Sequence, residues 1–410
     1  MPESTGEDPI VIIGGGHAAA QLCAGLVDAG IGAGVQLICE EAELPYQRPP
    51  LSKAFLKNPQ DALQMHRGAD WFAQNSIGVH LGDPAVSIDR TFRRVHLRSG
   101  ATVSYAKLVI ATGARARRLP SLPEILHNVA SLRSAADAVR LRAQIEAASA
   151  ATVIGGGFIG LEIAATAKVL GKTVTVLESA PRLLARSVSP ELSEHVVQTH
   201  RASGIDVRLG VSVGHFEVHA GSLDAVIVDG QREPVELVVL GIGGMPEEAL
   251  AHEAGLPCAN GIVVDAFMRT ADPAILAIGD CTSFPQHATG HRMRLESVQN
   301  ANDQARTALA TLLGREEPYR ALPWFWSEQG GLRLQMAGLM PHDERALRLR
   351  RPGAAPTNFS ILHYLGDQLR CVESVNAPLD HMAARKLLEA GKSPDPAAAG
   401  DAAVPLKAYL

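Results

Sequence analysis

The chain has 410 residues, more than a single domain usually holds, so we expect two or three domains. Apolar residues make up 46% of the chain and charged residues 20%, a balance typical of a globular protein. The net charge is −5 with no long run of either sign, which argues against extensive nucleic-acid binding and leaves local patches for charged partners.

The N-terminus shows no targeting signal, because residues 1–8 are acidic and polar rather than basic and then apolar. Two apolar stretches, 10–27 and 151–167, resemble membrane spans. Three consecutive glycines break each stretch, and polar residues interrupt both, with Glu162 in the middle of the second. We therefore expect a cytoplasmic protein that binds no membrane.

The first elements form a β-α-β unit. Residues 10–13 read as a buried parallel strand, 17–29 as a helix that ends at two glycines, and 35–40 as a second strand that ends in acids. Between the first strand and the helix lies the run Gly14-Gly15-Gly16. This order of elements predicts an α/β domain.

This first glycine turn is suited to a dinucleotide. Gly14 allows the tight bend, Gly16 lets a pyrophosphate approach the backbone, and Ala19 lets helix and strand pack closely. Glu40 lies 26 residues after Gly14, where an acid can accept hydrogen bonds from ribose hydroxyls. The alternative is a purely structural glycine turn, which the full strand, turn, helix, strand and acid context disfavours.

Residues 44–53 contain three prolines and two cations, Arg48 and Lys53, and are not expected to form a regular element. Solvation is the usual fate of such cations. Here the prolines would hold both side chains rigidly, which favours a functional role.

Short strands are expected at 79–81, 85–89 and 94–97. A buried strand follows at 105–111 and closes with the turn Thr112-Gly113. An amphipathic helix at 134–148 precedes a second β-α-β unit at 152–178. This unit carries the second glycine turn, 141 residues after the first. Two such turns predict that one chain holds two dinucleotides and passes electrons between them.

The second turn comprises Gly155, Gly157 and Gly160, and Glu178 follows 23 residues after Gly155. An acid at the ribose position favours NAD over NADP because it would repel a 2′-phosphate, although Arg182 and Arg186 lie nearby in the sequence. Glu162 is expected in the first helical turn. It could pair with the helix dipole or with solvent, or lie beside a bound nicotinamide.

Further strands are expected at 206–209, 225–228, 235–240, 262–264 and 275–277, with a helix at 296–313. Asp280 follows a buried strand and Gly279, where ligands bind at the carboxyl edge of a parallel sheet, and a helix cap is the alternative.

The remainder forms a third, α+β unit. Its expected elements are strands at 332–337, 346–349, 358–364 and 371–375, a helix at 379–390 and a loose segment at 392–403. Trp324 and Trp326 at its start could be core residues.

The five cysteines are scattered, with no Cys-x-x-Cys pair and no metal-binding spacing. Scattered single cysteines are usually small buried apolar residues. We therefore expect neither a redox-active disulfide nor a metal site.

The chain resembles the FAD-dependent NADH:ferredoxin reductases of bacterial aromatic-ring dioxygenase and cytochrome P450 systems over nearly its whole length. The most specific marks are Arg48-Pro49-Pro50-Leu51-Ser52-Lys53 and Pro323-Trp324-Phe325-Trp326-Ser327. The others are the two glycine turns and the segments 111–113, 239–243, 277–280 and 295–301.

The resemblance implies two Rossmann-like, glutathione-reductase-like domains and a C-terminal α+β interface domain. An FAD domain would comprise residues 1–116 and 246–323, an NAD domain residues 117–245, and the C-terminal domain residues 324–410. The implied FAD-binding residues are Gly14, Gly16, His17, Ala18, Glu40, Arg48, Lys53, Val86, Ala111, Thr112, Gly113, Arg133, Gly279, Asp280, Glu296, Ser297, Val298 and Trp326. The implied NAD-binding residues are Gly155, Gly157, Phe158, Ile159, Gly160, Glu162, Glu178, Arg186, Gly241, Ile242 and Gly243.

By the same resemblance, tightly bound FAD takes a hydride from NADH at flavin N5 and releases electrons singly to a [2Fe-2S] ferredoxin that supplies a terminal oxygenase. Lys53 would lie near N5, held by Glu162, and offset charge on the reduced flavin, while Trp326 would stack near the ring system. An acidic ferredoxin would meet a basic patch, for which Arg67, Arg306 and Arg333 are candidates.

Two positions depart from the family pattern. Gln47 replaces the usual acid before Arg-Pro-Pro, and Cys39 stands where glycine is common. Two rival functions share this fold. A disulfide reductase or NADH peroxidase would need a reactive cysteine near the flavin, and only Cys39 is close. A signalling or DNA-binding flavoprotein like apoptosis-inducing factor would need a basic surface and a targeting segment.

Overall fold

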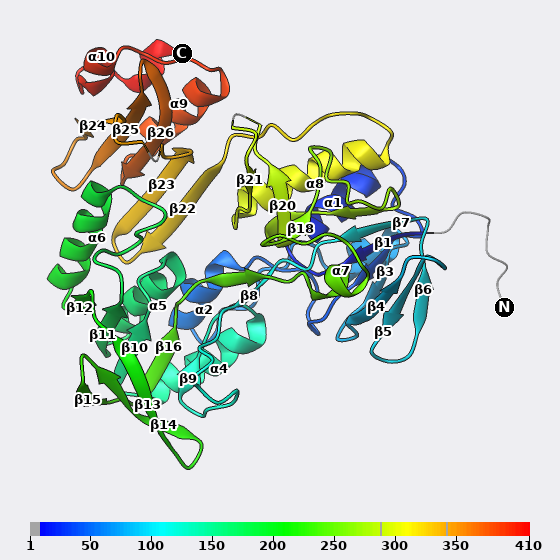
Figure 1. Cartoon of the computed structure of the whole chain (residues 1–410), viewed down its shortest axis with the longest axis horizontal. Helices are drawn as coiled ribbons and strands as arrows, with labels where there is room; N and C mark the ends of the chain where they lie inside the picture. Colours follow the sequence, from blue (N-terminus) through cyan, green and yellow to red (C-terminus); the bar gives the residue numbers. More distant parts are fainter. Residues whose placement is uncertain (1–8, 288, 342) are drawn as a thin grey trace. The chain divides into compact units, whose positions relative to one another are not determined.

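The computed structural model describes residues 9–287, 289–341 and 343–410, so the acidic N-terminal segment 1–8 lies outside the described residues. Its contacts group the chain into two compact units (Figure 1). The first unit comprises residues 1–48, 62–115 and 244–321. The second comprises 49–61, 116–243 and 322–410. The domain limits expected from the sequence stay a prediction.

The first unit is built on a parallel sheet of order β19-β7-β1-β2-β3. Its strands are β1 (Ile10–Ile13), β2 (Gln36–Ile38), β3 (Gly78–His80), β7 (Lys107–Ile110) and β19 (Ile275–Ala277). Helices α1 (His17–Asp28) and α8 (Val298–Leu312) pack against each other.

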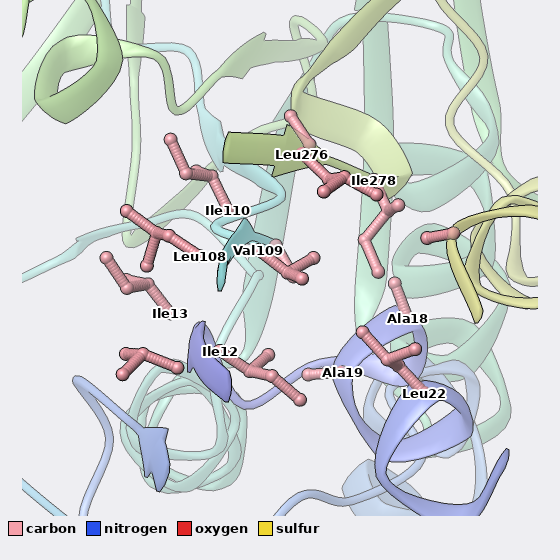
Figure 2. Packing of buried hydrophobic residues seen from close by; sticks show 14 of the residues in the cluster. Ile12, Ile13, Ala18, Ala19, Leu22, Leu108, Val109, Ile110, Leu276 and Ile278 are labelled. Carbon is pink, nitrogen blue, oxygen red and sulfur yellow. The ribbon is translucent and has the colours of Figure 1, made fainter. Parts of the chain in front are cut away.

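Alternate residues of the central strands point to opposite faces of this sheet. Figure 2 shows Ile12 and Val109 pointing toward the face where α1 presents Ala19, and Leu108 pointing to the other face. All four side chains are fully buried. The continuous β-branched runs of β1 and β7 follow from this burial on both faces, as expected for strands of a parallel sheet.

Smaller elements complete the first unit. They are α3 (Ala69–Gln74), the antiparallel sheet β4 (Ala85–Asp89), β5 (Arg94–Leu97) and β6 (Thr102–Ser104), the pair β8 (Ala114–Ala116) and β17 (Gly244–Pro246), α7 (Ala249–Glu253), the 3-10 helix η2 (Gly279–Cys281), and the sheet β18 (Ile262–Val263), β20 (Thr282–Pro285) and β21 (Arg292–Met293).

The second unit contains a parallel sheet of order β12-β11-β10-β16-β9. Its strands are β9 (Val129–Ala130), β10 (Ala150–Ile154), β11 (Thr173–Glu178), β12 (Asp206–Leu209) and β16 (Leu237–Leu240). Its helices are α4 (Ala135–Ala147), α5 (Phe158–Val169) and α6 (Pro190–Ala202), and an antiparallel sheet is formed by β13 (Val213–His219), β14 (Ser222–Val228) and β15 (Gln231–Pro234).

The same unit contains the C-terminal antiparallel sheet of order β22-β23-β26-β25-β24. Its strands are β22 (Trp324–Gln329), β23 (Leu332–Gly338), β24 (Leu347–Pro352), β25 (Phe359–Leu365) and β26 (Gln368–Val375). Helix α9 (Pro378–Glu389) packs on β23 and β26 (Figure 1), and α10 (Pro396–Gly400) and η3 (Leu406–Tyr409) follow. The α/β class with a third α+β part is therefore confirmed.

Proline explains three places where the sequence-based expectations about regular structure were wrong. The segments 44–53 and 392–403 were expected to be irregular, and α6 was not expected. Instead Pro49 begins the 3-10 helix η1 (Pro49–Ser52), which continues into α2 (Ala54–Lys57). Pro190 and Pro396 lie in the first turns of α6 and α10, behind the capping side chains of Ser189 and Asp395. Proline is favoured at the first helical position, where its missing N–H would have no partner.

Within the described part of the chain, no helix is both long and apolar enough to cross a membrane.

Candidate active site

The first glycine turn follows β1 and has the shape that a dinucleotide needs. Gly14 has φ +118°, and a Cβ at this position would lie 2.2 Å from the carbonyl oxygen of Ala111, so no other residue fits. Gly16 has open space where a Cβ would be, and it precedes α1 without a side-chain cap. Helix amides are therefore left to face an anion, which fits a pyrophosphate.

The neighbouring strands bring the other predicted residues of the first unit to the same sheet edge. Thr112, after β7, donates its hydroxyl to the carbonyl of Glu247 at 2.6 Å. After β19, Gly279 has φ +83° and approaches Ala18, whose Cβ would lie 3.3 Å from a Cβ at Gly279. Asp280 follows inside η2, whose N-cap is Ile278, so the helix-cap alternative for Asp280 is wrong.

Arg48 is held by an ion pair in the first unit rather than solvated. Its Nη2 lies 2.6 Å from Glu41 Oε1, and its Nη1 donates to the Tyr46 hydroxyl at 3.1 Å. The Tyr46 hydroxyl in turn donates to Glu41 Oε2 at 2.5 Å. Burial lowers the pKa of Arg48, but Glu41, Tyr46 and Asp280 together raise it above the usual value. Arg48 is thus a fixed cation with Asp280 within electrostatic reach.

The other FAD contacts predicted in the first unit stay predictions. Glu40 is exposed at the end of β2, and Val86 is 46% exposed on β4. His17 packs edge-on against His66 with ring centroids 4.6 Å apart. Ser297 caps α8 by accepting the Asn300 N–H at 3.0 Å, so it has a structural role here. Gln47, which replaces the usual acid, is exposed.

Cys39 fills the space beneath the first turn. A Cβ at Gly15 would lie 2.9 Å from its sulfur, so a side chain at position 15 would clash with the thiol of Cys39. Burial, with a smaller contribution from Glu41, raises the pKa of Cys39 to about 12. All five cysteines are free, and four of them are buried. The expectation that they are small buried residues is confirmed for these four, while Cys258 is only partly buried.

The second glycine turn repeats the first. Gly155 has φ +105°, and a Cβ there would lie 2.5 Å from the carbonyl oxygen of Gly241. A Cβ at Gly160 would lie 2.8 Å from the carbonyl oxygen of Gly155. The start of α5, the turn and the end of β16 therefore meet with no room for side chains, again leaving backbone N–H groups at a helix N-terminus.

Glu178 lies at the end of β11 and reaches this turn. Its Oε2 accepts the Gly156 N–H at 2.5 Å. Arg182 donates to the carbonyls of Val188 and Ala185, at 2.8 and 2.5 Å, which occupies its guanidinium. Arg186 is exposed. Glu178, the acid at the predicted ribose position, thus lies next to the turn. Of the two arginines that could have favoured a 2′-phosphate, Arg182 is already bound to backbone carbonyls.

Lys53, which is partly buried, and Glu162, which is buried, form an ion pair in the second unit, with Lys53 Nζ 2.6 Å from Glu162 Oε2. The predicted contact between these residues is confirmed. The expectation that Glu162 lies in the first helical turn is wrong, because α5 begins at Phe158 and Glu162 is its fifth residue. Its burial, with 3% of its surface exposed, also excludes a solvated role.

Two serines that the sequence analysis did not single out complete this pair. Ser52 donates its hydroxyl to Glu162 Oε2 at 2.5 Å, and Ser327 donates to Glu162 Oε1 at 2.6 Å. A signal for Ser327 was available. In a strand beginning at Trp324, alternation puts Ser327 and Gln329 on one face with Phe325, and polar residues on a packed face need partners.

The tryptophans at the start of the C-terminal sheet are neighbours on one face of β22. Their ring centroids lie 5.5 Å apart with planes tilted by 29°, and Arg385 lies over the Trp324 ring at 4.2 Å. Trp326 keeps partial exposure. The alternative that both are simple core residues is therefore wrong.

Comparisons with known proteins agree with this arrangement. The family model described as pyridine nucleotide-disulphide oxidoreductase matches residues 8–305, and the model described as reductase C-terminal matches residues 324–410. Rhodocoxin reductase of Rhodococcus erythropolis is 42% identical, covering 97% of this chain and 93% of that protein.

Two further proteins are similar over the whole chain. The ferredoxin–NAD(+) reductase component of the anthranilate 1,2-dioxygenase system of Burkholderia cepacia is 38% identical, covering 98% of this chain and 99% of its own. The crystal structure of the ferredoxin reductase for the CYP199A2 system from Rhodopseudomonas palustris has a TM-score of 0.94 and 42% identity. It covers 98% of this chain and all of that one.

The two glycine turns of matching geometry and these full-length similarities lead to one conclusion: the chain belongs to the ferredoxin–NAD(+) reductase family of FAD-containing pyridine nucleotide oxidoreductases.

Proposed function

We propose that this protein passes electrons from NADH through tightly bound FAD to a [2Fe-2S] ferredoxin, which supplies a dioxygenase, demethylase or cytochrome P450. The observation that carries the proposal is the repeated glycine turn. Each copy ends a parallel strand, needs a positive φ at its first glycine and opens an uncapped helix. One turn per unit gives one dinucleotide per unit.

The residues of the first unit fit FAD. The backbone around Gly14 and Gly16 would receive the pyrophosphate, while Arg48 would supply a fixed positive charge and Asp280 a hydrogen-bonding carboxylate. When bound, FAD supplies the redox chemistry, since it takes electrons in a pair and gives them up singly. No protein nucleophile is required.

The residues of the second unit fit NADH. The turn from Gly155 to Gly160 would receive its pyrophosphate, and Glu178 would accept hydrogen bonds from the ribose hydroxyls. Because a carboxylate repels a 2′-phosphate, we expect NADH to be preferred over NADPH. Lys53, held by Glu162, would offset negative charge on the reduced flavin.

The ferredoxin would be acidic and would meet exposed arginines. Arg67, Arg306 and Arg333 are all exposed. Arg306 already has a carboxylate neighbour in Asp303 on its own helix, and Arg333 has one in Glu328 on the adjacent strand β22, so Arg67 is the stronger candidate among the three. We also infer a cytoplasmic location, because all five cysteines are free, as is usual in a reducing compartment.

The test is direct. The purified protein should show a flavin absorption spectrum, oxidise NADH faster than NADPH, and reduce a [2Fe-2S] ferredoxin. A colourless protein, or one whose NADH oxidation never reduces any added ferredoxin, would contradict the proposal.

A further inference from the structure

The two carboxylate oxygens of Glu162 have different partners. Oε2 accepts from Lys53 Nζ at 2.6 Å and from the Ser52 hydroxyl at 2.5 Å, so both partners of this oxygen come from the segment 49–53 that contains η1. Oε1 accepts from the Ser327 hydroxyl at 2.6 Å, on β22 of the C-terminal sheet. A carboxylate bonded through both oxygens cannot rotate without losing a charge-assisted hydrogen bond.

The direction of the Ser327 hydroxyl is itself determined by buried neighbours. Gln329 Nε2 donates to Ser327 Oγ at 3.2 Å, so the serine oxygen accepts there and its proton is left for Glu162. Gln329 Oε1 faces His200 Nε2 of α6 at 2.9 Å. Burial lowers the pKa of His200, so the imidazole is neutral at pH 7 and donates from Nε2.

A single chain of donors therefore runs from His200 through Gln329 and Ser327 to Glu162. Its members are nearly or fully buried, with exposed fractions of 3%, 2%, 0% and 3%. Each donor has one acceptor in this order, and reversing one bond would leave a buried polar group unpaired. The chain links α6, β22 and α5, all within the second unit.

The position of Lys53 depends on this carboxylate. An ammonium has three N–H groups, and those of Lys53 have Glu162 Oε2, the Pro49 carbonyl at 3.2 Å and Ser52 Oγ at 3.3 Å as acceptors. Pro49 and Ser52 belong to η1, the 3-10 helix directly before Lys53, so Glu162 is the one partner of the three that lies outside this segment. Thr166, on the same helix as Glu162, holds the Ser52 carbonyl at 2.8 Å.

We propose that Ser327 is a positioning residue of the NADH site: by holding Oε1 of Glu162, the C-terminal domain sets the carboxylate that holds Lys53. The inference rests on the proposed function of Lys53 and Glu162. It gives the C-terminal domain a role in reduction by NADH, in addition to any role as an interface.

The test compares Ser327→Ala with Ser374→Ala in the intact, flavin-loaded protein. Ser374 is equally buried on β26, which is separated from β22 in the same sheet by β23, and it shares a hydroxyl contact with Ser360, which also has Asp380 as a partner. The control therefore removes a buried hydroxyl from the same sheet without touching the donor chain.

Two measurements separate positioning from general damage. The first is the rate of flavin reduction by NADH in anaerobic single turnover, which Ser327→Ala should lower by about tenfold, the effect of one hydrogen bond to a charged group. The second is acylation of Lys53 by an acetyl ester, quantified by peptide mass spectrometry in protein with and without FAD. Because Glu162 would no longer be fixed through Oε1, Lys53 should react several-fold faster in Ser327→Ala and at the original rate in Ser374→Ala.

A second variant guards against failure to fold. Gln329→Met removes the donor that orients Ser327, so it should change both rates in the same direction as Ser327→Ala but by less. Adding it to Ser327→Ala should change the rates little further, because both substitutions act on the same series of hydrogen bonds. Original flavin-reduction and Lys53-acylation rates in a folded Ser327→Ala or Gln329→Met protein would overturn the proposal. If the unmodified protein lacks flavin or is not reduced by NADH, the proposed function fails instead, while Lys53 acylation still reports on the donor chain.

Discussion

Gly160 and Gly241 meet backbone to backbone: a Cβ on Gly241 would lie 2.9 Å from the Cα of Gly160. The contact brings the first turn of α5 against the end of β16, which closes the second glycine turn around Gly155. Close packing between helix and strand is the role that a third glycine has in dinucleotide-binding turns.

Replacing Gly160 with alanine should therefore loosen the second unit and its NAD site. The new methyl group would press on the Gly155 carbonyl, at 2.8 Å, and overpacking of this kind costs about 1–3 kcal/mol. Urea unfolding and NAD⁺ titration should both show the loss. Gly214→Ala is the matched control, because a Cβ there has no atom within 4 Å, and equal losses in both variants would refute the steric explanation.

Gly14→Ala should give a protein that retains little FAD. The substitution meets both a left-handed φ of +118° and the Ala111 carbonyl at 2.2 Å, so the turn must move before the methyl group fits. The ratio of flavin to protein absorbance in purified samples measures the effect. Gly68→Ala, with open space around its Cβ in the same unit, should keep the original ratio.

Separating the Lys53–Glu162 pair should destabilise the protein strongly. Lys53→Met would leave the Glu162 carboxylate, with 4% of its side chain exposed, without its cation, at a cost of about 3–5 kcal/mol. The double variant Lys53→Met, Glu162→Gln should recover part of that cost in denaturant unfolding. The exposed pair Arg118–Glu124 is a control, and Glu124→Gln should cost less than about 1 kcal/mol.

Cys39→Ser should retain NADH oxidation and ferredoxin reduction, because the thiol is buried packing with a pKa raised to about 12. The folded parent protein should react slowly with a disulfide reagent at pH 8 until it is denatured. Complete loss of NADH oxidation in a folded Cys39→Ser protein would restore the disulfide-reductase alternative.

His381 should make stability depend on pH below neutrality. Burial, assisted by Arg385 and Arg333, lowers its pKa from 6.5 to about 4, and neither ring nitrogen has a hydrogen-bond partner among the described residues. Between pH 6.5 and 4 the unfolded chain binds the proton and the folded protein does not, so stability falls as pH is lowered through this window.

Each pH unit by which the folded pKa is lowered corresponds to about 1.4 kcal/mol of stability. His381→Leu should flatten the dependence of melting temperature on pH between 6.5 and 4, with stability at pH 7 unchanged or higher. The exposed His219 serves as control, and an identical pH dependence in His381→Leu and the parent protein would contradict the assignment.

Local sequence determined the two dinucleotide units. Strand, glycine turn, helix and acid lie within about 30 residues, and a left-handed glycine or a buried β-branched run depends on its own backbone and immediate neighbours. Gly14, Gly155, Glu178 and the Lys53–Glu162 contact could therefore be anticipated, the last through resemblance rather than spacing. Prolines misled the expectations for 44–53 and 392–403, since a proline ends a helix or begins one according to which residue caps it.

Only the tertiary structure decided what surrounds Glu162. Its partners Lys53 and Ser327 lie 109 and 165 positions away in the chain, so nothing in the local pattern pairs them. A helical glutamate near a glycine turn can face solvent or the interior, and the packing of the 3-10 helix η1 and strand β22 on α5 selects the interior. The physical reason is desolvation: once those elements exclude water, the carboxylate must take every hydrogen bond from the residues that the fold brings to it.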